Sequence, residues 1–90
     1  MAKYPTNKRQ FISDVTDSAS FTRIFHTGFI ANNMLISNDS LNSIDYSFDG
    51  TAIDGTLLAG DTLELNDYIV MDTVYFKSAA GNDAFRVWFW

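Results

Sequence analysis

The 90-residue sequence contains no cysteine, one proline and one histidine. Without cysteine the chain has neither a disulfide framework nor a zinc site built on thiolates, which is consistent with a reducing compartment. Its longest apolar runs are about five residues, whereas a membrane-spanning helix needs about 20. The N-terminal residues also lack the apolar segment of a signal peptide. We therefore expect folding in the cytoplasm of the cell that makes the protein, and no membrane partner.

The sequence also lacks the patterns expected of an active site or a metal site. His26 is the lone histidine, and no nucleophile motif such as GxSxG accompanies it. Acidic residues are frequent in the predicted loops, but the spacing of a calcium-binding EF-hand loop is absent. We expect no catalytic residue, no metal and no cofactor, so the chain is not expected to be an enzyme.

The composition and charge predict one acidic, well-packed domain. Hydrophobic residues make up 47% of the chain and aromatic residues 16%, enough for a core. Residues 1–30 hold four cations and two acids, a net +2, whereas residues 31–90 hold two cations and nine acids, a net −7. A negative body repels phosphate backbones, so no nucleic-acid partner is expected. The split indicates either a basic arm on an acidic body or chance placement.

Strand signals dominate the chain. Ile44, Tyr46 and Phe48 alternate with polar residues, as in a half-buried strand, and Asp49-Gly50 then marks a turn. Similar segments recur every 8–12 residues, typical of all-β folds. We predict one small β-sandwich (jelly-roll-like) or barrel of about seven or eight antiparallel strands, with residues 1–9 as an N-terminal arm and residues 10–90 as the domain.

Two segments admit more specific predictions. The five residues Ala79–Asp83 resemble a hairpin loop, which would pair the strands on either side of it. Residues 20–25 resemble a strand, and residues 28–39 resemble a turn followed by a longer strand. Phe21, Ile24 and Phe25 also match helical spacing, so a helix remains an alternative over residues 20–31.

The last strand, AFRVWFW, has two contrasting faces. Phe85, Val87 and Phe89 are predicted to fill the core, while Arg86, Trp88 and Trp90 point the other way. An exposed apolar patch of this kind marks interaction sites, so we expect the N-terminal arm or a neighbouring subunit to cover it. Arg86 is expected to stack over Trp88 or to pair with an acid such as Asp72.

The order of these segments resembles a group of small all-β virion proteins of tailed bacteriophages. The resemblance spans roughly residues 8–90 and is most specific in DYSFDGT, LLAGDTLEL and RVWFW. It implies a structural virion component located in the virion, and most often a capsid decoration or cement protein. The implied partner is the major capsid protein or another virion protein.

The predicted role follows from this resemblance together with the aromatic last strand. A decoration protein would form a homo-oligomer, with a trimer favoured at capsid threefold positions. The alternatives are a head–tail adaptor, a tail or fibre-associated protein, or a small glycan-binding module whose platform would draw on Tyr46, Tyr68, Tyr75, Trp88 and Trp90. The candidate interface residues are Lys3, Lys8, Arg9, Phe11, Arg86, Trp88 and Trp90.

Overall fold

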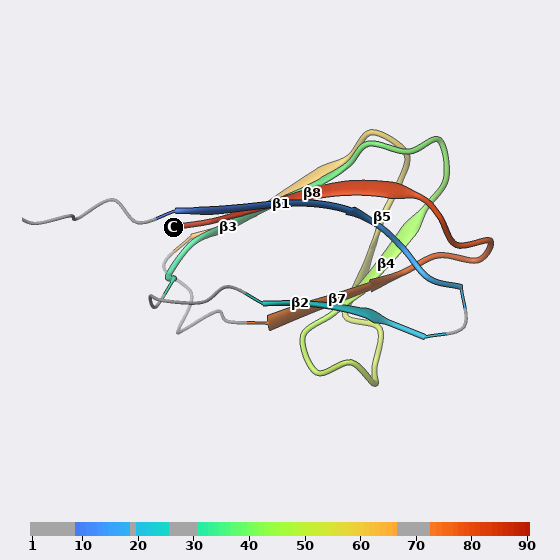
Figure 1. Ribbon diagram of the computed structural model, residues 1–90, viewed down its shortest axis with the longest axis horizontal. Coiled ribbons are helices and arrows are strands. Elements are labelled where there is room, and N and C mark those ends of the chain that lie inside the picture. Colours follow the sequence, from blue (N-terminus) through green and yellow to red (C-terminus); the bar gives the residue numbers. More distant parts are fainter. Residues whose placement is uncertain (1–8, 19, 26–30, 67–72) are drawn as a thin grey trace, which may run out of the picture.

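The computed structural model describes residues 9–18, 20–25, 31–66 and 73–90, and in them the chain forms two antiparallel four-stranded sheets and no helix (Figure 1). The first sheet contains β1 (Gln10–Val15), β3 (Met34–Asn38), β6 (Thr62–Leu65) and β8 (Ala84–Phe89). The second sheet contains β2 (Thr22–Phe25), β4 (Ile44–Ser47), β5 (Gly55–Leu57) and β7 (Thr73–Lys77). The eight strands confirm the predicted all-β class.

The strand order is that of a jelly roll. The first sheet runs β1-β8-β3-β6 and the second runs β2-β7-β4-β5. The pairs β1–β8, β2–β7, β3–β6 and β4–β5 are those of one long hairpin folded at the β4–β5 connection. The further pairs β3–β8 and β4–β7 roll this hairpin into two layers. Of the two predicted architectures, the structure therefore has the jelly-roll-like sandwich.

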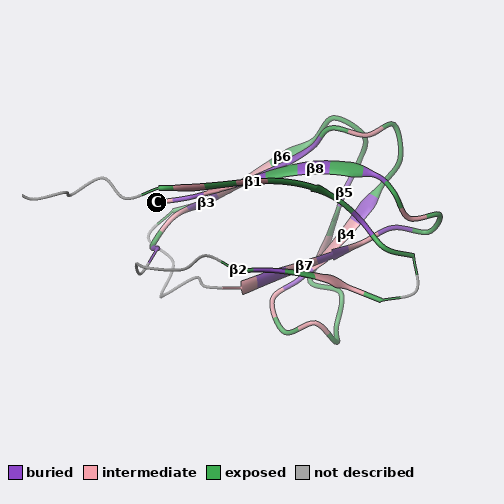
Figure 2. Ribbon diagram, viewed as in Figure 1, coloured by how far each residue is buried: buried purple, intermediate pink, exposed green. Residues whose placement is uncertain are grey.

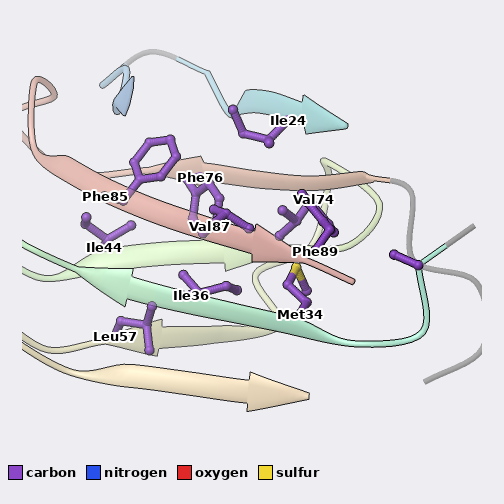
Figure 3. Packing of buried hydrophobic residues seen from close by; sticks show 11 residues of the cluster. Ile24, Met34, Ile36, Ile44, Leu57, Val74, Phe76, Phe85, Val87 and Phe89 are labelled. Carbon is purple, nitrogen blue, oxygen red and sulfur yellow. The ribbon is translucent and has the colours of Figure 1, made fainter. Parts of the chain in front are cut away.

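The core lies between the two sheets and follows from the alternation of side chains along each strand (Figure 3). Val74 and Phe76 of β7 are fully buried, while Tyr75 and Lys77 between and beyond them are only partly buried. The rings of Phe76 and Phe85 join the two layers, with centroids 4.3 Å apart. The hydrophobic residues with no exposed surface are Ala31, Met34, Ile36, Ile44, Val74, Phe76, Phe85, Val87 and Phe89.

Two predictions about local structure are wrong. Ala79–Asp83 is not a hairpin loop, because β7 and β8 belong to different sheets and the segment crosses between the layers. The helical alternative for residues 20–31 is also wrong where the structure describes it. Thr22–Phe25 forms β2, with Ile24 in the core.

Hydrogen bonds among the connecting loops place one acidic residue beside β8. The buried Asn38 side-chain amide donates to the carbonyl oxygens of Asn42, Leu57 and Leu58, at 2.8, 3.0 and 3.1 Å. The next residue, Asp39, donates its backbone N–H to the carbonyl of Ala84 at 3.0 Å. The loop after β3 is thereby held against the start of β8.

The described residues form no helix that could span a membrane. The predicted N-terminal arm, apart from Arg9, lies outside the described residues, and β1 begins at Gln10.

Candidate functional site

The last strand, β8, separates its side chains as predicted. Phe85, Val87 and Phe89 have no exposed surface, whereas Arg86 is exposed and Trp88 is half-buried (Figure 2). β8 is a central strand of the first sheet, with β1 on one side and β3 on the other. Its outward side chains are therefore flanked on both sides by those of neighbouring strands.

One row of outward side chains crosses the whole first sheet. Trp88 lies opposite Phe11 of β1 and opposite Leu35 of β3, and Leu35 lies opposite Glu64 of β6. The rings of Phe11 and Trp88 have centroids 5.2 Å apart and are tilted by 42°, a favourable aromatic contact. Phe11 is 54% exposed. We call Phe11, Trp88 and Leu35 the apolar row; it ends at the acidic residue Glu64.

Arg86 forms a polar border beside the apolar row. Its guanidinium lies 5.1 Å from the centre of a Trp88 ring, so the predicted stacking is confirmed. Its Nη2 also donates to Asp39 Oδ1 at 2.9 Å, and its Nε donates to Asp39 Oδ2. These hydrogen bonds from Arg86 hold the pKa of Asp39 below its ordinary value. The acid partner is thus Asp39, and Asp72 lies outside the described residues.

Trp90 lies just beyond the end of β8, because the strand stops at Phe89 and not at the predicted Trp90. Its backbone N–H still donates to the carbonyl of Asn33, and its carbonyl accepts from the N–H of Asn33, at 3.1 and 3.0 Å. A groove of about 370 Å³ opens beside it, lined by Arg9, Leu35, Trp88, Phe89 and Trp90. The groove adjoins the apolar row at Leu35 and Trp88.

Five of the seven candidate interface residues belong to one region of the first sheet. Phe11, Arg86 and Trp88 lie on its outer face, and Arg9 and Trp90 line the adjoining groove. Lys3 and Lys8 lie outside the described residues, as does His26. The candidate list omitted Leu35, Asp39 and Glu64. Alternation in MLISN indicates that Leu35 faces away from Met34 and Ile36, but the pattern carries no information about which strand lies beside it.

The outer face of the second sheet carries cations on aromatic rings. Lys77 Nζ lies 4.6 Å from the ring centre of Phe21, and the Arg23 guanidinium lies 5.0 Å from that of Phe25. Tyr75 meets Phe21 edge-on, with centroids 6.4 Å apart.

Of the tyrosines proposed for a glycan platform, Tyr46 packs against the core and Tyr68 lies outside the described residues. Tyr75 is half-buried on the second sheet, away from Trp88 on the first. The structure therefore does not bring the five proposed platform residues together.

Two acidic loop residues in the described part of the chain, Asp49 and Asp61, support turns. Asp49 Oδ1 accepts the backbone N–H groups of Thr51 and Ala52 at 2.8 and 3.0 Å, which lowers the pKa of Asp49. Asp61 caps the N–H of Leu58 in the same manner at 3.0 Å. Among the described residues, no three acidic or histidine side chains form a group able to hold a metal ion.

Comparison with known proteins supports the fold. No family model and no curated protein matches the chain. Among solved structures, the one titled "Crystal structure of PirA" is similar, with a TM-score of 0.56 at 14% identity over 98% of both chains. At that identity the similarity shows a shared fold, and the functional argument rests on the site.

Proposed function

We propose that this protein is a structural component of a tailed-bacteriophage particle that decorates and stabilises the head shell. The observation that carries the proposal is the apolar row on the outer face of the first sheet. Phe11 is more than half exposed there, next to Trp88 and Leu35. Contiguous apolar surface rimmed by polar groups is characteristic of protein-binding sites.

The chemistry of this surface suits a protein contact. Tryptophan, phenylalanine and arginine are enriched at interfaces, because their side chains combine large contact area with directed polar groups. The Arg86–Asp39 pair and the stacking of Arg86 on Trp88 hold the border of the row in one arrangement. The resemblance to small virion proteins in DYSFDGT, LLAGDTLEL and RVWFW supports a particle as the setting.

Copy number per particle tests the proposal. Quantitative mass spectrometry of purified particles is expected to find hundreds of copies, as for a protein that covers a shell. A handful of copies would instead place the protein at the neck or tail, because the protein rings of the neck and tail hold small multiples of three or six subunits. Absence from purified particles would refute a virion role.

Glycan binding is the second candidate, because the groove presents two indoles and an arginine together. Stacking of a sugar on Trp88 or Trp90 would change tryptophan emission, so a fluorescence titration with mono- and oligosaccharides tests this candidate. Unchanged emission across the series would reject it.

A further inference from the structure

We propose that a second copy of this chain covers the apolar row, forming a dimer with a two-fold axis that runs along the strands between β8 and β3. The inference deepens the proposed function, since it assigns the apolar row to the contact between two copies, in place of the trimer that the resemblance favoured, and makes the dimer the unit that decorates the shell. The dimer rests on the proposed function only in one respect, namely that the outer face of the first sheet is a protein contact. The argument comes from the order of side chains across the first sheet.

The two ends of the apolar row differ, and each end fits the other end of a second copy. From β1 to β6 the residues are Phe11, Trp88 and Leu35 of the row, followed by Glu64. A two-fold rotation about the proposed axis places β1 over β6 of the second copy and β8 over β3. The indole of Trp88 then covers the second copy's Leu35 at the centre, and Phe11 covers the methylene groups of its Glu64. Each apolar side chain thus gains a partner that it lacks within one chain.

Charge complementarity selects the second copy as the occupant. Arg9 precedes β1 at one edge of the face, and Glu64 lies on β6 at the opposite edge. Both are exposed, and neither forms an ion pair with another described residue. The same rotation brings Arg9 of each copy toward Glu64 of the other. By register the two residues are offset by two positions, roughly 7 Å along the strands, within reach of their long side chains.

The charges also determine the direction of the axis. An axis in the interface perpendicular to the strands would place β1 over β1 and β6 over β6. Arg9 would then have no acidic residue opposite it, and two Glu64 side chains would share one edge. The axis parallel to the strands instead forms two opposite-charge contacts, one at each edge of an apolar centre, as isologous interfaces require.

Sedimentation of the full-length protein tests the dimer. We expect a reversible monomer–dimer equilibrium at concentrations up to about 1 mM, with Trp88→Ala largely monomeric. Arg9→Glu and Glu64→Arg are each expected to weaken dimerisation about tenfold, because each substitution creates like-charge contacts at both edges. The double variant Arg9→Glu/Glu64→Arg restores opposite charges and is expected to recover most of the wild-type affinity.

A matched control lies on the other sheet. Arg23 is an exposed arginine on the edge strand β2, so Arg23→Glu makes the same charge change away from the proposed contact. It is expected to leave the dimer constant unchanged, and circular dichroism checks that every variant is folded. A monomer at all concentrations, a trimer, or a dimer that the double variant fails to restore would overturn the proposal.

Co-sedimentation with particles separates this inference from the proposed function. A monomer that still binds particles at high copy number would leave the decoration role standing and refute the dimer. A dimer that shows the expected charge dependence but does not bind particles would support the dimer and refute the decoration role.

Discussion

The two outer faces of the sandwich use similar residues to different effect. On the first sheet, Phe11, Trp88 and Leu35 adjoin one another across three strands, and the neighbouring Arg86 is paired with Asp39. On the second sheet no outward cross-strand pair of described residues joins two apolar side chains; Arg23, for example, lies opposite Tyr75. Aromatic residues there support cations instead of adjoining one another. Continuity across strands therefore distinguishes the face for which we propose a binding role from the other outer face.

The largest expected effect separates the inner and outer sides of β8. Phe85→Ala removes a fully buried ring from between the sheets and is expected to lower the free energy of unfolding by about 3–5 kcal/mol. Trp88→Ala is expected to cost about 1 kcal/mol in the monomer, because the indole is only half-buried, while it disrupts assembly. Urea unfolding of the monomer measures both. Equal losses would place Trp88 in the core and remove the contrast between the two sides.

A glycine pair tests how the second face is supported. Gly50 has φ of 80°, and a methyl group there would approach the Tyr75 ring to 2.9 Å; Gly60 has φ of 79° with open space around it. Both alanine variants adopt a strained left-handed backbone that costs about 1–2 kcal/mol. Gly50→Ala is expected to cost about 1 kcal/mol more, through crowding of Tyr75. Equal unfolding energies for the two variants would show that Tyr75 moves aside freely.

The outer face of the second sheet is expected to promote self-association when a substitution makes its apolar residues contiguous across strands. Arg23→Leu in a Trp88→Ala background places an aliphatic side chain between Phe25 and Tyr75 and removes one cation. Self-association is expected to strengthen about tenfold relative to Trp88→Ala alone, measured by sedimentation. Arg23→Lys in the same background is the control, because it keeps the charge. No gain with leucine would mean that charge at this position does not limit association.

The smallest expected effect is on the stability of the folded protein at acidic pH. The pKa of Asp39 is lowered in the folded state, first by its hydrogen bonds from Arg86. The unfolded chain then binds a proton more readily than the folded chain, so this contribution is complete above the ordinary aspartate pKa of about 4 and is lost as pH falls through the lower, folded value. We expect Asp39→Asn to show a slightly smaller drop in melting temperature between neutral and acidic pH than wild type. An unchanged drop would show that the Arg86 contact contributes nothing to stability.

The sequence and structure agree on which way side chains point and differ on which strands are neighbours. Alternation correctly separated Phe85, Val87 and Phe89 from Arg86 and Trp88, because successive side chains of a strand leave on opposite faces. The same local pattern made Ala79–Asp83 resemble a hairpin loop, although it crosses between layers. A short polar loop is compatible with either connection, and only the packing of the two sheets chooses between them.

The candidate site shows the same division. Arg86, Trp88 and Trp90 were identifiable because aromatic residues alternate with core residues in AFRVWFW. The acid that pairs with Arg86 could not be identified from the sequence, because Asp39 is 47 residues away and several acidic residues were equally available. Asp39 is the partner because loop contacts hold it against the start of β8.

By itself, the sequence determined an all-β chain with a last strand that carries aromatic residues on both faces, since period-two alternation is a property of neighbouring residues. Only the tertiary structure decided that Phe11 and Leu35 lie on either side of Trp88 and that Glu64 ends their row. Register between strands far apart in the chain arises from burying both inner faces at once. The outer surface, and the binding that we propose for it, follow from that packing.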